Sequence, residues 1–195
     1  GILGLRDTHG AEAETHGIEW IDLVAVNLYP FESTVQSGDP SMEDAMEQVD
    51  IGGPTMVRAA AKNHKHVSVV VDPSDYSRVL SSLNGEGVGA DLRSELALKA
   101  FRHTAAYDSV IASWLARKAS AQGLPQESAV ALRKTASLRY GENPHQKAGL
   151  FTNINQQSKS GIAHYNQIQG KELSYNNFND ADAAFELVNE FNEPA

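Results

Sequence analysis

Two short apolar runs stand out in the first half of the chain. Residues 21–27 are mostly apolar and end just before the turn-forming pair Tyr29 and Pro30, and residues 67–71 are rich in β-branched valine. Nearly continuous apolar runs of this length are typical of parallel strands that are buried on both faces. The pattern therefore predicts two buried strands of one parallel sheet.

Segments with helical spacing alternate with these runs. Ser41 begins one expected helix, with Asp44 at capping-box spacing, and Pro54 opens a second helix that we expect to end near Asn63. A third helix is expected after Asp72, and apolar steps of three or four residues predict one long helix or two abutting helices from about residue 91 to residue 123. Strands that alternate with helices predict an α/β fold with a parallel sheet.

The last third of the chain changes character. Residues 119–134 lose clear periodicity, as linkers do, and residues 180–191 have the spacing of a helix. Three short segments between them are expected to be strands: residues 136–140, 149–152 and 162–168. We therefore expect a first domain over residues 1–118, a linker over 119–135 and the start of a second domain over 136–195.

Composition excludes several classes of function. The chain has 195 residues, of which 41% are hydrophobic and 21% charged, and no apolar run approaches the roughly 18 residues of a membrane span. Its net charge of -9 argues against nucleic-acid binding as the main task. The chain has no cysteine, which excludes disulfides and thiolate metal sites and is compatible with a cytoplasmic location. The first residue is not Met and the last follows an amphipathic segment, so we interpret the chain as an internal piece of a longer protein.

Polar and aromatic residues follow the first apolar run. Asn27 and Tyr29 stand at its carboxyl end, which is where open α/β sheets bind ligands. The alternative is that Tyr29 and Phe31 only cover the sheet edge while Asn27 satisfies a turn.

A glycine-rich turn follows at residues 50–55, with the sequence Asp-Ile-Gly-Gly-Pro-Thr. It combines the carboxylate of Asp50 with two glycines and a helix start whose free N–H groups favour anions, so it fits a polar ligand group. The alternative is a turn between helices in which Asp50 only caps.

Lys62 follows three alanines, and partial burial there would suit it to proton transfer by lowering its pKa. The alternative is a lysine that only complements the dipole of the helix end. A continuous helix would separate Asp50 from Lys62 by about 18 Å, so one ligand can meet both only if the chain bends at Gly52 and Gly53 or a second subunit contributes.

The loop over residues 138–146 is built for polar recognition. Arg139 can hold a phosphate or carboxylate with two hydrogen bonds, and Tyr140 can stack on a ring. A solvated turn is the alternative. His64 and His66 have no third ligand beside them in the sequence, so we expect no metal site.

These segments together resemble the bifunctional AICAR formyltransferase/IMP cyclohydrolase family. The resemblance spans nearly the whole chain, and its order is more specific than any single motif. It rests on residues 27–31 (Asn-Leu-Tyr-Pro-Phe), 50–55, 58–64, 99–101, 103–108, 138–146 and 170–177.

The resemblance implies a cyclohydrolase domain with a methylglyoxal-synthase-like α/β fold, incomplete at its N-terminus. There the carboxamide nitrogen of FAICAR attacks the formyl carbon, and water is lost to give IMP. The matching positions imply that Lys62 transfers protons with help from Tyr29 and Asp50. They imply that Asn27, Ile51 and Gly52 line the nucleotide.

The resemblance also implies the start of a cytidine-deaminase-like transformylase domain, where AICAR receives a formyl group from 10-formyltetrahydrofolate. Arg139 and Tyr140 match AICAR-binding positions. The family further implies a cytoplasmic homodimer, with no metal required for the cyclohydrolase. The family's transformylase Lys–His pair would lie beyond Ala195 and its phosphate-binding segments before Gly1, so we expect the 195-residue chain alone to catalyse neither step at a normal rate.

Two further readings stay open. One alternative is a noncatalytic module that keeps the fold for purine-nucleotide binding or assembly, and the other is a plain α/β scaffold. A nucleotide that binds without turnover favours the first of these, and failure to bind any purine monophosphate favours the second.

Overall fold

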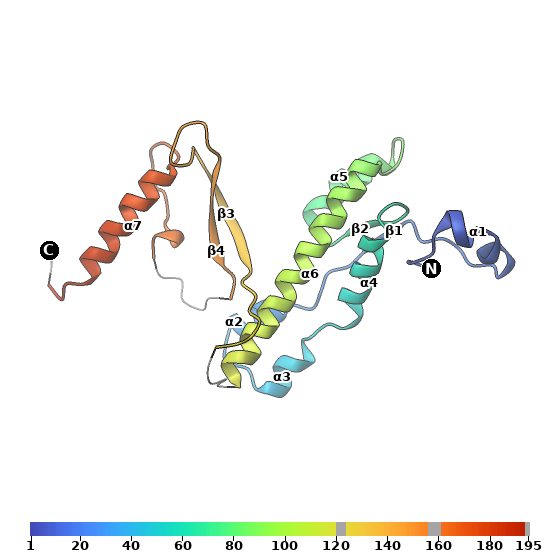
Figure 1. Ribbon diagram of the computed structural model, residues 1–195, viewed down its shortest axis with the longest axis horizontal. Helices are drawn as coiled ribbons and strands as arrows, with labels where there is room; N and C mark the ends of the chain where they lie inside the picture. The colour runs from blue at the N-terminus through green and yellow to red at the C-terminus, as the bar shows by residue number, and fades with distance from the viewer. Residues whose placement is uncertain (120–123, 156–160, 194–195) are drawn as a thin grey trace. The chain divides into compact units, whose positions relative to one another are not determined.

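The chain folds into two units, Gly1–Ala129 and Val130–Ala195. The computed structural model describes residues 1–119, 124–155 and 161–193, coloured in chain order in Figure 1. Each unit has its own strands and helices, and each is described by itself below. The described parts contain no helix that is both long and apolar enough to cross a membrane.

Two parallel strands form the centre of the first unit. β1 (Leu23–Ala25) pairs with β2 (Ser68–Val70), and Val24 lies opposite Val69. Every residue of β2 is buried, as are Val67 and Val71 on either side of it. The predicted parallel pair is confirmed, and β2 is buried on both faces as its unbroken apolar run predicts.

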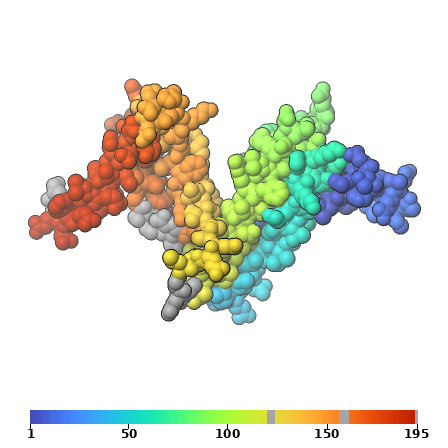
Figure 2. Space-filling view, viewed as in Figure 1, coloured from blue at the N-terminus to red at the C-terminus, as the bar shows by residue number. Residues whose placement is uncertain are grey.

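Two helices cover this pair. α4 (Gly52–Lys62) turns Val57, Ala60 and Ala61 inward, and α6 (Ala90–Lys118) contributes Ala97 and Ala100 to the same core. Small side chains at these positions let the two helices approach closely, and the atoms of α4 and α6 form one continuous surface (Figures 1 and 2). Of the two arrangements expected for the long segment, the structure has one unbroken helix of 29 residues.

No helix was predicted between the first strand and Ser41, yet the structure has one there. Residues 31–36 form α2 (Phe31–Gln36), in which Phe31 and Val35 lie one turn apart and are both buried. The ring of Phe31 meets those of Trp114 and Tyr107 edge to face, with centroid distances of 5.9 and 6.4 Å. Burial of this ring against α6 stabilises a helix too short to form alone.

Four shorter helical segments also belong to the first unit. α3 (Met42–Glu47) is capped as predicted, because the Ser41 hydroxyl accepts the Asp44 N–H. A 3₁₀ turn, η1 (Pro73–Asp75), leads into α5 (Tyr76–Leu83) as expected. α1 (Arg6–Thr15) was not predicted, because Ala13 is its one buried residue and it has no apolar stripe.

A network of charges lies at the end of β2. The Lys99 ammonium contacts carboxylate oxygens of Asp72 and Asp75, both at 2.7 Å. Arg78 bridges Asp75 to Glu95 on α6. The hydrogen bond from Lys99, together with those from Ser74, lowers the pKa of Asp72 to about 2. Burial alone would lower the pKa of Lys99, but its contacts with Asp72 and Asp75 together outweigh this effect and raise it.

The second unit is built on an antiparallel pair. β3 (Leu132–Leu138) pairs with β4 (Ala148–Asn153), and the register is irregular between Lys134 and Ala136. α7 (Tyr175–Asn189) begins five residues earlier than expected, because Ser174 and Asn177 form a reciprocal capping box. The strand expected over residues 162–168 is wrong, since Ile162–His164 is a 3₁₀ turn, η2.

Replacement of the buried Phe31 ring tests how the first unit is held together. We expect Phe31→Ala to lower the free energy of unfolding by about 3–5 kcal/mol, because it leaves a cavity beside Trp114. Phe101→Ala is the control, since Phe101 is 38% exposed and loses much less. Urea unfolding followed by circular dichroism measures both, and equal losses would contradict this packing.

Titration of Asp72 tests the charge network. Because its folded-state pKa lies below its ordinary value of 3.8, the ionised carboxylate stabilises the fold above about pH 4 and this contribution is lost as pH falls through about 2. The side chain is 42% exposed, so we expect at most about 1 kcal/mol. Between pH 5 and pH 2, the urea midpoint of unfolding should fall less steeply for Asp72→Asn than for the unchanged protein. Parallel pH profiles of the two proteins would exclude a contribution of Asp72 to stability.

Candidate functional site

The carboxyl end of β1 meets the first turn of α4. Tyr29 follows β1 by four residues, and its backbone N–H donates to the Asp50 Oδ2 atom at 3.3 Å. The Asp50 Oδ1 atom accepts the Gly53 N–H at 2.7 Å. Asp50 therefore caps the helix, as the alternative to a ligand-binding role predicted, and it also ties the helix to the segment after β1.

Gly53 is the residue that this arrangement requires. A Cβ atom at position 53 would collide with the carboxylate of Asp50 and with the side chain of Leu28. The close approach of Asp50 to the helix start therefore depends on a glycine. Gly52, the first residue of α4, has open space around its Cα and is exposed.

Tyr107 holds Asp50 from the opposite side. Its hydroxyl accepts the Asp50 backbone N–H at 2.8 Å and donates to the Gln48 carbonyl oxygen at 3.1 Å. Burial raises the pKa of Tyr107, and the negative charge of Asp50 adds to this effect. Sequence reasoning treated Tyr107 only as an apolar position of a helix, because nothing local shows that its hydroxyl reaches a residue 57 positions away.

Five predicted site residues surround the start of α4: Asn27, Tyr29, Asp50, Ile51 and Gly52. All of them except Asp50 are exposed to solvent. Tyr29 is 56% exposed and Ile51 is 76% exposed, so neither serves the core. Asn27 and Gly52 are exposed as well. Tyr29 is thus open to a ligand, whereas for Phe31 a packing role is confirmed by its complete burial.

Lys62 lies at the other end of α4. The expectation that three alanines would bury it is wrong, because Ala60 and Ala61 face the core while the next residue faces solvent. α4 runs without interruption from Gly52, so Lys62 stands roughly 15 Å along the helix from that residue. The bend considered at Gly52 and Gly53 is absent, and Asp50 and Lys62 of one chain do not meet.

A hollow of about 450 Å³ adjoins Lys62. Leu3, Pro54, Thr55, Arg58, Ala59 and Phe101 line it together with Lys62. The guanidinium carbon of Arg58 lies 5.6 Å from the centroid of the Phe101 ring. The hollow is open to solvent and carries two cationic side chains on one face of α4.

Arg139 and Tyr140 lie in the second unit and contact each other. The Arg139 guanidinium lies over the Tyr140 ring at 4.8 Å and donates to its hydroxyl at 3.2 Å. The pKa of Tyr140 is lowered, mainly by a hydrogen bond with Ser174 and next by the hydrogen bond from Arg139. Two backbone bonds fix this segment to the start of α7: Arg139 N–H donates to the Leu173 carbonyl, and Tyr175 N–H to that of Tyr140.

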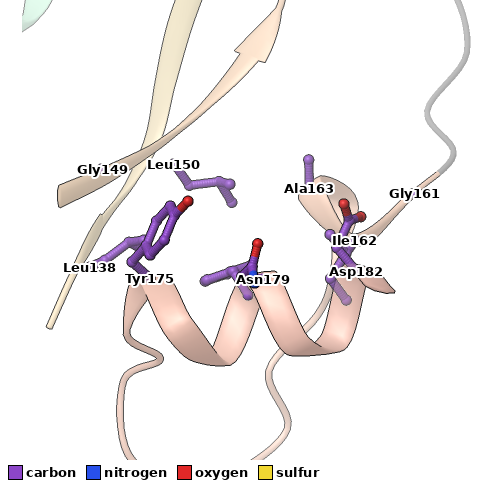
Figure 3. Close-up of a pocket in the computed structure, with 10 residues that line it drawn as sticks. Leu138, Gly149, Leu150, Gly161, Ile162, Ala163, Tyr175, Asn179 and Asp182 are labelled. Atoms are coloured by element: carbon purple, nitrogen blue, oxygen red, sulfur yellow. The ribbon is translucent and has the colours of Figure 1, made fainter. Parts of the chain in front are cut away.

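A second hollow, of about 420 Å³, separates α7 from β3, β4 and η2. In Figure 3, Tyr175, Asn179 and Asp182 rise from successive turns of α7 toward Leu150 and Ala163. Neither Asn179 nor Asp182 was predicted from the sequence to be a site residue, because both stand where the expected helix begins.

Histidines provide no further site in the described residues. His64 and His66 lie in the turn before β2 instead of on a strand, and the His64 Nδ1 atom pairs with the Ala61 carbonyl oxygen. The parts of the chain that the structure describes hold no group of three or more His, Cys, Asp or Glu side chains suited to a metal ion.

Comparison with known proteins identifies the family. The family model of the AICARFT/IMPCHase bienzyme matches residues 60–195. The bifunctional purine biosynthesis proteins PurH of Halalkalibacterium halodurans and Bacillus cereus (strain AH187) are each 52% identical over the whole chain, which spans 38% of their length. The crystal structure of ForH matches with a TM-score of 0.51 and 38% identity, over 57% of this chain and 59% of that one. The chain therefore belongs to the AICARFT/IMPCHase bienzyme family.

Proposed function

We propose that this chain serves the final two steps of purine ring synthesis as part of a cytoplasmic bifunctional enzyme. AICAR receives a formyl group to give FAICAR, and FAICAR closes to IMP with loss of water. The observation that carries the proposal is 52% identity, over every residue of the chain, to proteins named for bifunctional purine biosynthesis.

The proposal divides the chain between two folds. Residues 1–118 belong to a methylglyoxal-synthase-like cyclohydrolase domain, residues 119–135 to a linker, and residues 136–195 to the start of a cytidine-deaminase-like transformylase domain. The parallel strands of the first unit and the antiparallel strands of the second support two domains, although β3 (Leu132–Leu138) overlaps the last four residues of this linker. Part of the linker, residues 120–123, lies outside the described residues.

Ring closure requires proton transfer at three atoms. The carboxamide nitrogen loses one proton as it bonds to the formyl carbon, the formamido nitrogen loses one as its double bond to that carbon forms, and the former formyl oxygen gains both protons and leaves as water. Lys62 carries the proton transfer, with Tyr29 and Asp50 assisting, while Asn27, Ile51 and Gly52 line the nucleotide. A positioned group of this kind typically contributes about 10²- to 10⁴-fold in rate, and an orientation that folds the reacting arms together adds to it.

The straight α4 supports a homodimer for this reaction. Asp50 and Lys62 lie beyond the reach of one another within a chain, because an unbroken helix separates them. A second copy that brings its Lys62 to the Asp50 end of the first removes this obstacle. Of the two solutions that the sequence allowed, a bend or a second subunit, we propose the second.

The transformylase step uses 10-formyltetrahydrofolate as the formyl donor, and the cyclohydrolase step requires no metal. Arg139 and Tyr140 bind AICAR. One N–H of the guanidinium donates to the Tyr140 hydroxyl, and its other donors stay available for an anionic group of the substrate.

Replacement of Lys62 tests the cyclohydrolase role. In a full-length protein that carries this sequence, we expect Lys62→Ala to lower kcat for FAICAR closure by about 10²-fold or more, because a proton-transfer group is removed. Lys65→Ala is the matched control, since Lys65 lies one turn away in an exposed ion pair with Asp7. An unchanged rate, with nucleotide still bound, would favour a noncatalytic binding module instead.

Tyr107→Phe tests whether the position of Asp50 matters. The substitution keeps the ring that packs on Phe31 but removes the partner of the Asp50 N–H, so we expect unfolding to become easier by about 1–2 kcal/mol. The displaced carboxylate should also lower kcat for ring closure more than it raises KM. A variant that loses stability and keeps kcat would show that Tyr107 serves the fold alone.

A further inference from the structure

The start of α7 is tied to the segment that follows β3. The Arg139 N–H donates to the Leu173 carbonyl oxygen at 3.1 Å. The Tyr175 N–H donates to the Tyr140 carbonyl oxygen at 3.0 Å. Ser174 lies between these two bonds along the chain, and it is only 1% exposed. The backbone therefore holds a buried serine beside the two side chains that are proposed to bind AICAR.

The Ser174 hydroxyl does more than cap the helix. It accepts the Asn177 N–H at 3.3 Å, and the Ser174 N–H donates in return to the Asn177 Oδ1 atom at 3.0 Å. These two bonds are the whole of a capping box. The same hydroxyl also forms a hydrogen bond with the Tyr140 side chain, which a capping box does not require. This additional bond is the one that needs a function.

The bond to Tyr140 also acts on Arg139. The Arg139 guanidinium donates to the Tyr140 hydroxyl at 3.2 Å and lies over its ring at 4.8 Å. Arg139 is exposed, and a long exposed side chain loses rotamer freedom when it binds a ligand. A phenol that is anchored on a buried hydroxyl orders the guanidinium before the ligand arrives. Less binding free energy is then lost on ordering the side chain.

We propose that Ser174 is a positioning residue for AICAR, because it fixes the Tyr140 phenol and, through it, the Arg139 guanidinium. The inference rests on the proposed function, which assigns AICAR to these two side chains. Asn176, in the first turn of α7, holds the same loop further along, since its side-chain amide donates to the Glu142 carbonyl oxygen at 3.2 Å. The start of α7 thus supports the AICAR-binding side chains without contacting the substrate through Ser174.

Two substitutions separate positioning from helix capping. Glycine replaces serine at an N-cap with little loss of stability, whereas alanine costs the helix more, and both remove the hydroxyl. In a full-length protein that carries this sequence, we expect Ser174→Gly and Ser174→Ala to raise KM for AICAR equally, by about tenfold. Only Ser174→Ala should clearly lower the urea midpoint of unfolding. KM for 10-formyltetrahydrofolate and kcat at saturating AICAR should change by less than about twofold.

Ser41→Ala is the matched control, because the Ser41 hydroxyl caps α3 in the first unit by accepting the Asp44 N–H at 3.0 Å. Its loss should leave KM for AICAR unchanged. The rate of FAICAR closure, measured on each variant, verifies that the first unit is intact. A rise in KM that is confined to Ser174→Ala, or an equal rise in Ser41→Ala, would overturn the positioning role.

Titration of the Tyr140 phenol in the 195-residue chain tests the inference without the reaction. The hydrogen bond with Ser174 is the main cause that lowers the Tyr140 pKa, so Ser174→Gly should raise this pKa and Ser41→Ala should not. ¹³C spectra of chains labelled in their tyrosine rings follow the titration, and Tyr140→Phe identifies the signal. An unchanged pKa in Ser174→Gly would overturn the inference. Absence of AICAR formylation by the unchanged full-length protein would instead overturn the proposed function.

Discussion

Burial of β2 is the constraint on which the first unit depends. A sheet of two parallel strands has two faces to cover, and the valines at 67, 69, 70 and 71 are each at most 5% exposed. α4 and α6 bury one group of these side chains, while Val79 of α5 and Leu96 of α6 bury Val70. Each apolar side chain buried in this way stabilises the fold by about 1.5–3 kcal/mol, so the helices cannot leave β2 without a large loss.

This constraint determines what α4 can present to a ligand. Its inner face is committed to the core through Val57, Ala60 and Ala61, so chemistry is confined to its two ends and its outer face. At the first end, Asp50 is held by the backbone of α4, by the segment after β1 and by Tyr107 of α6. A carboxylate fixed by three elements has little freedom to lose when it meets a ligand, which is the property that a positioned catalytic group needs.

The sequence predicts those parts of the fold whose pattern is local. α4 and α6 carry apolar periodicity over several turns, and β1 and β2 lie in nearly continuous apolar runs. Each of the four was predicted to within a few residues. α2 and η2 were missed because their structure depends on contacts such as that of Phe31 with Trp114, 83 positions away. The site follows the same rule. Asp50 and Lys62 could be chosen from motifs, whereas the role of Tyr107 depends on its contact with Asp50 and the position of Arg58 on its contact with Phe101 of α6.

The unbroken helix also separates two kinds of chemistry. The Asp50 end offers a carboxylate, backbone amides and the exposed Tyr29 phenol, while the outer face toward Lys62 offers cations and an aromatic wall. Because α4 is rigid and its inner face is packed, these two sets of groups keep a fixed separation of roughly ten helical residues. A ligand that needs both sets must therefore draw one of them from another copy of the chain.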